Sequence, residues 1–281
     1  MNMKKIITLL LSLILAIGAF AACSFDDGTD INDGDSADNG KIVIATGPKS
    51  SDTYKIGKEI VSVLNKNGMD AETLETEGYA RNIKHLTGKN ADLAVVSKDF
   101  LDDDVEVKTI TDLYTESVHF VVRGDSNISS VDQLREKKIA IEKDGSRFEE
   151  IAEDLLDDYG LDYNDVKVEY VDKKEALARL KDKKVDAAFV MGKLPDKGIG
   201  TLAKDIKLSI LPIGTDRVLD DLMEDGYEKQ TIAVDTYGNK DKVATVGVKC
   251  MLVARNDISN DTINKIKKII EDNKDTILKN Y

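Results

Sequence analysis

The fold is decided by the stretch from Lys41 to Val96, which reads KIVIATGPKSSDTYKIGKEIVSVLNKNGMDAETLETEGYARNIKHLTGKNADLAVV. Three short apolar runs in it, at 41–45, 69–74 and 93–96, predict strands. Between them lie two segments in which apolar residues recur every three or four positions, and a glycine ends each segment. Strands that alternate with helices in this way predict a mostly parallel sheet with right-handed crossovers.

The same order of elements occurs a second time after Ser129. Strands are expected at 138–141, 166–171 and 187–190, with one helix beginning at Ser146 and another running through Ala176 and Leu180. The sequence therefore predicts a second α/β unit of the same kind.

Two extended apolar runs connect the units, Ser117–Val122 (SVHFVV) and Val243–Ala254 (VATVGVKCMLVA). We interpret them as two crossings between a lobe I, made of 41–123 and 245–281, and a lobe II, made of 124–244. The last helix should then pack back on lobe I through one apolar face, formed by Ile263, Ile266, Ile269 and Ile270. Two such lobes with two hinge crossings are typical of periplasmic binding proteins, whose ligand lies in the cleft where helix N-termini converge.

The first residues predict an export signal. Lys4 and Lys5 precede an uncharged run from Ile6 to Phe20, and Ala21-Ala22-Cys23 follows it. The run has about 15 residues, whereas roughly 20 are needed to cross a bilayer. The small pair before a cysteine resembles a bacterial lipoprotein signal, so 1–22 would be removed and Cys23 would carry the lipid; the alternative is an ordinary secretory peptide with an incidental cysteine.

Residues 23–40 are expected to form a flexible acidic tether, because they contain Asp, Gly, Asn and Ser with almost nothing to bury. Two acyl chains suffice for stable anchoring. The mature protein is therefore expected at the extracytoplasmic face of the cell membrane, held by a lipid anchor.

Composition excludes several classes of protein. The 281 residues include 53 acidic and 40 basic ones, a formal net charge of −13, which argues against a nucleic-acid partner. Two cysteines and two histidines provide little for a metal centre or a disulfide framework. The sequence contains no G-x-S-x-G, H-E-x-x-H or P-loop motif. We expect a non-catalytic monomer with no metal and no other cofactor.

Motifs along nearly all of 41–281 resemble those of the TRAP-associated extracytoplasmic immunogenic (TAXI) solute receptors, in the family's order and spacing. These motifs are Thr46-Gly47, Thr53-Tyr54, Thr76–Asn82, Ala91–Ala94, Leu113–His119, Ser130–Leu134, Gly145-Ser146, Asp186–Phe189, Pro195, Tyr237-Gly238 and Val246–Ala254. The resemblance implies a type II periplasmic-binding-protein fold. It also implies capture of a glutamate-like amino acid or a dicarboxylate, which is delivered to a sodium-coupled TRAP membrane permease.

The chain departs from the family's pattern at positions expected near the ligand. The opening loop is usually T-G-G-T-x-G-x-Y-Y, whereas residues 46–54 read TGPKSSDTY. Tyr79 replaces a common Ser, and Arg147-Phe148 replace a usual Gly-Thr. These departures concern the ligand and not the fold.

The expected chemistry is reversible binding of an anionic or zwitterionic small molecule at helix starts, where free N–H groups and the helix dipole favour negative charge. Thr46, Ser51, Thr53 and Tyr54 belong to the first such start. Ser51 and Thr53 either cap the helix or contact the ligand. Asp52 would repel a carboxylate but would suit an ammonium group.

Gly145 and Ser146 open the matching helix of the second unit. Arg147 would offer a planar, bidentate group to a carboxylate, or is simply a surface arginine. Ser146 and Glu149 also form a capping box, in which Glu149 would compete with a ligand for backbone donors.

Three further candidates lie elsewhere. Asn82 would contact the ligand or make a local cap, Ser97 ends a strand where open α/β sheets present ligands, and Tyr237 would line the site or pack in the core. His119 is expected to be a core or hinge histidine, and Cys250 a buried free thiol.

A receptor of the same fold can also act as a sensor that signals to a membrane kinase, or can serve another transporter. A neighbouring gene for a large permease would favour transport, and a neighbouring histidine kinase would favour sensing.

Overall fold

The computed structural model describes residues 40–49, 51–101, 104–142, 147–214, 219–220, 222–223 and 226–279. The expected signal peptide, the lipidation site Cys23, most of the tether, and Gly145 and Ser146 lie outside these residues. Within the described part of the chain, no helix has the length and apolar character needed to cross a membrane.

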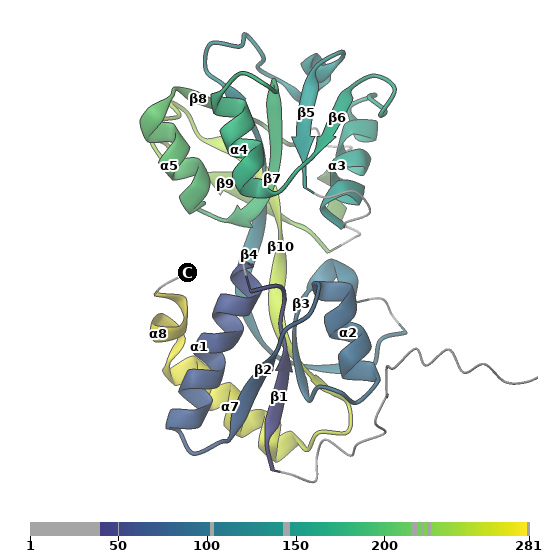
Figure 1. The fold of residues 1–281 in the computed structure, drawn as a ribbon, viewed down its shortest axis with the longest axis vertical. Coiled ribbons are helices and arrows are strands. Elements are labelled where there is room, and N and C mark those ends of the chain that lie inside the picture. Colours follow the sequence, from purple (N-terminus) through teal and green to yellow (C-terminus); the bar gives the residue numbers. More distant parts are fainter. Residues whose placement is uncertain are drawn as a thin grey trace, which may run out of the picture. The chain divides into compact units, whose positions relative to one another are not determined.

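The first α/β unit forms as predicted (Figure 1). Its parallel strands lie in the order β2-β1-β3, with helices α1 and α2 between them in sequence. The elements are β1 (Ile42–Ala45), α1 (Asp52–Lys66), β2 (Ala71–Leu74), α2 (Tyr79–Thr87) and β3 (Leu93–Ser97). The buried face of α1 carries the apolar residues that recur at helical spacing, including Ile56, Ile60 and Val63.

The second unit also forms, with β6 and β7 parallel to β5. Its elements are β5 (Lys138–Ile141), α3 (Arg147–Asp158), β6 (Lys167–Tyr170), α4 (Lys173–Lys181), β7 (Ala187–Lys193) and α5 (Lys197–Asp205). Short 3₁₀ helices η1 (Lys98–Phe100) and η2 (Val131–Leu134) follow β3 and precede β5.

Two long antiparallel strands, β4 (Val107–Arg123) and β10 (Val243–Arg255), join the units into one sheet of order β2-β1-β3-β10-β4-β7-β5-β6. Two short strands lie off this path: β8 (Leu208–Leu211) pairs with β4, and β9 (Glu228–Ile232) pairs with β10. The centre of the sheet is thus antiparallel, which the prediction of a mostly parallel sheet did not include. The antiparallel pairs come from the crossing strands, because β10 pairs antiparallel with β3 and β4, and β4 pairs antiparallel with β7.

The crossing strands contribute to four hydrophobic clusters, two in each lobe, and two of these clusters lie on the face that α1 and α3 cover. Tyr114 and Cys250 pack with α1 and α7 (Asn260–Asp272), whereas Val118 and Val248 pack with α3. Each crossing strand therefore passes from the core of one lobe to the core of the other, between residues 114 and 118 in β4 and between residues 248 and 250 in β10. Two separate cores linked by two strands make a two-lobed molecule.

The C-terminal helices cover the first core. In α7, Ile263, Ile266 and Ile270 are buried in the same cluster as Ile56 and Ile60 of α1, and α8 (Lys274–Leu278) adds Ile277. The prediction that the last helix returns to the first unit is confirmed.

Candidate functional site

The carboxyl ends of both sets of parallel strands meet at the middle of the crossing strands. Ser97, the last residue of β3, lies opposite Cys250, which lies opposite Tyr114. Lys193, the last residue of β7, lies opposite Glu116. Open α/β sheets bind ligands outside the carboxyl ends of their strands, so this crossing is the natural place for a site.

Four of these residues share one face of the sheet, because paired residues point the same way and side chains alternate along a strand. This set, which we call the crossing face, consists of Ser97, Tyr114, Glu116 and Cys250, and Lys193 of β7 lies beside Glu116 on the same face. It is the face on which α1 packs in one lobe and α3 in the other. The crossing face therefore lies between the lobes on the α1 and α3 side.

Two polar atoms of the crossing face are buried without a hydrogen-bond partner among the described residues. Ser97 is 2% exposed and its Oγ makes no hydrogen bond. Glu116 is 8% exposed; its Oε1 accepts a long bond of 3.4 Å from the Tyr114 hydroxyl, and its Oε2 accepts none. Buried polar atoms in native proteins nearly always have partners, so these two atoms mark a place where another molecule can supply one.

Burial raises the pKa of Glu116 from 4.5 to about 7, whereas a hydrogen bond from the Tyr79 side chain lowers it. Asp99 and Glu142 raise the pKa of Glu116 further, and Lys173 lowers it.

The opposite face holds a hydrogen-bonded network. The Tyr237 hydroxyl accepts a bond of 2.6 Å from the backbone N–H of Asp196 and shares a bond of 3.1 Å with His119 Nε2. Burial lowers the pKa of His119 from 6.5 to about 4, so the ring is neutral at pH 7. His119 is fully buried at the crossing, and Tyr237 packs beside it.

The network continues into the starts of two helices. Asp196 forms an ion pair with Lys173 and caps α5 by accepting a bond of 2.9 Å from the Ile199 N–H. Asp172 caps α4 in the same way, through the Glu175 N–H at 2.8 Å. Neither aspartate was predicted from the sequence, although each stands directly before a helical pattern, which is the usual signal of a cap. A carboxylate at each start makes α4 and α5 poor sites for an anion.

The start of α1 is held by its own side chains. Ser51 caps the helix, since its Oγ accepts from the Tyr54 N–H at 3.2 Å and donates to the Pro48 carbonyl at 2.7 Å. Thr53 Oγ1 lies 2.8 Å from the same hydroxyl. A Cβ on Gly47 would lie 2.3 Å from Thr53 Oγ1, so this turn needs a glycine. That Ser51, Thr53 or Tyr54 contacts a ligand stays a prediction.

Thr46 and Asn82 have protein partners. The Asn82 amide donates to the Val95 carbonyl at 2.7 Å and accepts from the Thr76 hydroxyl at 2.5 Å. Thr46 donates from Oγ1 to the Leu74 carbonyl at 3.1 Å, and its own carbonyl lies 3.0 Å from Thr76 Oγ1. Both residues are fully buried and tie the strand ends of lobe I together.

The start of α3 is described from Arg147 on, but the Arg147 side chain is not. Gly145 and Ser146 lie outside the described residues, so a ligand role for these three residues stays a prediction. The start of α1 lies close enough to lobe II to affect it electrostatically. Burial is the main cause of two pKa shifts in lobe II: it raises the pKa of Glu142 and lowers that of Lys193. The Asp52 carboxylate raises the pKa of both residues.

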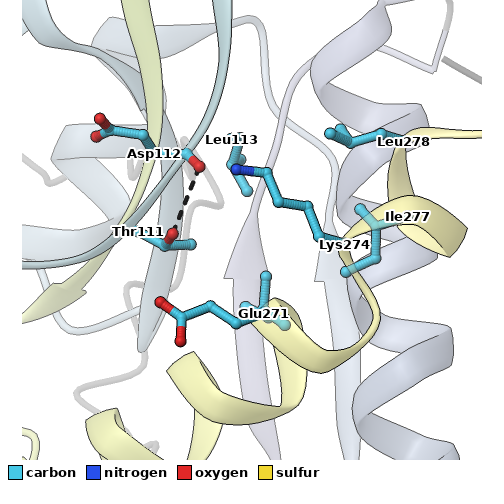
Figure 2. A pocket seen from close by; sticks show the side chains of 8 residues that line it. Thr111, Asp112, Leu113, Glu271, Lys274, Ile277 and Leu278 are labelled. Carbon is cyan, nitrogen blue, oxygen red and sulfur yellow. Dashed lines mark hydrogen bonds between the residues drawn. The ribbon is translucent and has the colours of Figure 1, made fainter.

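Two surface hollows lie elsewhere. One lies between β4 and the C-terminal helices, lined by Thr111, Leu113 and Lys274 among others, and Figure 2 shows the Lys274 amine directed toward Leu113. The other is formed by the end of α5 with Tyr237 and Gly238. Neither is lined by the crossing face. The described residues also contain no cluster of three or more metal-ligating side chains, and Cys250 is the buried free thiol that was predicted.

The architecture is that of the type II periplasmic binding proteins, as predicted. A putative sulfonate ABC transporter's periplasmic sulfonate-binding protein, SsuA from Methylobacillus flagellatus KT, matches over 86% of this chain and 72% of its own, with a TM-score of 0.54 and 17% identity. An ancestral arginine-binding protein bound to arginine matches over 86% and 98%, with a TM-score of 0.54 and 16% identity. The GluR0 ligand-binding core with L-glutamate matches over 87% and 96%, with a TM-score of 0.51 and 14% identity.

A family model also matches the chain. The model of the NMT1-like family matches residues 44–280. The chain belongs to that family.

Proposed function

We propose that this protein is an extracytoplasmic receptor that captures a small amino acid or organic anion by closing its two lobes on it. The observation that carries the proposal is the crossing face, where strand ends of both lobes meet and two buried polar atoms have no partner among the described residues. A buried polar group without a hydrogen bond costs roughly 1–3 kcal/mol, which a bound ligand would recover.

Lobe I, 41–123 with 245–281, and lobe II, 124–244, would close by bending at β4 and β10. Contacts to both lobes exist only in the closed state, so a ligand shifts the population toward it. A change from 1:99 to 99:1 closed needs about 5.5 kcal/mol of differential affinity. Two or three charge-assisted hydrogen bonds, at roughly 1.5–3 kcal/mol each, would supply that.

We further propose a lipid anchor at Cys23 and delivery of the ligand to a TRAP-type permease. The lipoprotein-like signal supports the anchor, and the TAXI-like motifs support the permease. Receptors of several kinds of transporter share this fold, so only the TAXI-like motifs support the TRAP-type permease.

The ligand class is tested by a thermal-shift panel on residues 24–281, which contain every described strand and helix. The panel includes amino acids, dicarboxylates and keto acids, together with sulfonates and arginine because structural neighbours are described as binding them. A true ligand at 100 times its Kd adds about 2.7 kcal/mol to the free energy of unfolding. If no compound in the panel raises the melting temperature, the proposed ligand classes are wrong.

A further inference from the structure

One edge of β10 carries a strand from each lobe. β3 pairs with this edge from Cys250 to Ala254, and β9 pairs with it from Val243 to Gly247. Only residues 248 and 249 lie between the two paired stretches. β3 therefore ends and β9 begins at a gap in the sheet, and the gap lies where the lobes would bend.

A hydrogen bond crosses this gap. Asp99 lies in η1, directly after β3, and Tyr227 directly precedes β9. The Tyr227 hydroxyl donates to Asp99 Oδ2 at 3.2 Å. The backbones also come close here, since a Cβ on Gly226 would lie 3.4 Å from Lys98 Cε. Segments of both lobes are therefore in direct contact beside β10.

Each partner of this bond is fixed to its own lobe. Tyr227 is 3% exposed and belongs to the hydrophobic cluster that α3 covers in lobe II. Next to Asp99, the ring of Phe100 packs on the ring of Tyr79, with centroids 5.3 Å apart, and Tyr79 packs on the cluster that α1 covers in lobe I. Neither side can follow the other lobe, so separation of the lobes at this gap must break the bond.

The bond lies on the crossing-face side of the sheet. Tyr227 packs under α3, and the hydroxyl of Tyr79 lies 3.7 Å from Sγ of Cys250, a crossing-face residue. Bending toward this side brings the two segments together, and bending away from it separates them. A hydrogen bond to a carboxylate is among the stronger ones in proteins, so it favours the closed arrangement.

We infer that the Tyr227–Asp99 hydrogen bond is a latch that stabilises the closed arrangement of the lobes. The inference rests on the lobe closure of the proposed function and names two residues that set its equilibrium. Both are positioning residues, which act on a ligand only through closure. Because apparent affinity scales with the fraction of binding-competent molecules, the latch would strengthen the binding of any ligand that requires the closed state.

The test measures the distance between the lobes without a ligand. Spin labels are attached through K58C on α1 and E153C on α3, two exposed positions on helices that cover the same face of the sheet in different lobes. Cys250 is fully buried and should not react. Pulsed electron–electron double resonance on residues 24–281 then gives the populations of short and long distances.

The labelled pair is measured in wild type, Y227F, D99A, the double variant Y227F/D99A and Y159F. Y159F is the matched control, because it removes a tyrosine hydroxyl that accepts from the Gly214 N–H at 3.1 Å within lobe II. Equal melting temperatures of Y227F and Y159F would show that loss of the latch leaves both lobes folded.

We expect Y227F and D99A each to lower the ratio of short to long distances by about three- to tenfold, the effect of one partly exposed hydrogen bond to a charged group. The double variant should lower it no further than the stronger single variant, because both substitutions remove the same bond. Y159F should match wild type.

A distance distribution of Y227F that matches wild type would overturn the inference, as would a single distance in every variant or additive effects in the double variant. A compound that still binds would then keep the receptor function intact. Conversely, a thermal-shift panel in which no compound binds would contradict the proposed ligand classes and leave the latch standing.

Discussion

Burial gives Glu116 and His119 opposite responses to pH. The pKa of Glu116 rises from 4.5 in the unfolded chain to about 7, so between these values the folded state holds a proton that the unfolded state has lost. Its contribution to stability is therefore lost as pH rises toward 7. The pKa of His119 falls from 6.5 to about 4, so its contribution is lost as pH falls from 6.5 toward 4.

We predict that E116Q removes the loss of stability that occurs between pH 4.5 and 7. A shift of this size corresponds to about 3–4 kcal/mol. Urea unfolding at a series of pH values measures it, with E72Q as the control whose profile should follow wild type, because Glu72 lies in an exposed ion pair with Lys41. A profile of E116Q that parallels wild type across this range would contradict the burial of the carboxyl group.

Gly57 permits a close contact within lobe I. A Cβ at this position would lie 2.2 Å from Thr46 Cγ2, and Thr46 cannot easily move because it is fully buried and bonded to Leu74.

Replacing a helical glycine by alanine normally stabilises a protein by about 1 kcal/mol. Here we predict that G57A destabilises by about 1–3 kcal/mol through overpacking. The double variant T46S/G57A, which lacks the clashing methyl group, should recover most of this loss in urea unfolding. Stabilisation by G57A alone would show that α1 does not pack on the end of β1 as described.

At the scale of elements, the sequence predicted those that carry a strong local pattern. The helical spacing in α1 and α7 and the β-branched runs in β1 and β3 are visible in any short window. The first half of β4 and the short strands β8 and β9 were missed, because charged and polar residues interrupt them and only pairing with β10 or β4 makes them strands. Secondary structure that depends on a distant partner carries little signal of its own.

The candidate site shows the same limit. Ser97 was predicted because it directly follows an apolar strand. Glu116 was not predicted as a site residue, because its burial results from the register that places it opposite Lys193 and Val248, far away in the sequence. Asn82 was predicted either to contact the ligand or to make a local cap, whereas its two protein partners depend on the packing of α2 against β3.

Ser51 and Ser259 cap their helices with the same geometry, so variants of the two residues can distinguish a capping role from a ligand-binding role. Ser51 caps α1 and Ser259 caps α7, each by accepting a backbone N–H at 3.2 Å. We predict that S51A and S259A each cost about 1 kcal/mol in urea unfolding. S51A alone should also weaken ligand binding, by about tenfold if its hydroxyl contacts the ligand. Equal affinities for the two variants would make Ser51 a cap only.

At the scale of the whole molecule, the cores of the two lobes are connected through one sheet, in which β4 and β10 run from one lobe to the other. Each lobe has its own hydrophobic cluster and its own parallel strands, so bending at the crossing need not disturb either core. The buried network of His119, Tyr237 and Asp196 lies on the opposite side of the sheet from Glu116.

Closure of the two lobes on a bound solute is tested most directly by small-angle X-ray scattering. Residues 24–281 are measured alone and with a saturating concentration of the tightest ligand from the thermal-shift panel. We predict a smaller radius of gyration with the ligand and no change with an equal concentration of a compound that does not bind. An unchanged radius of gyration with a tightly bound ligand would contradict the account.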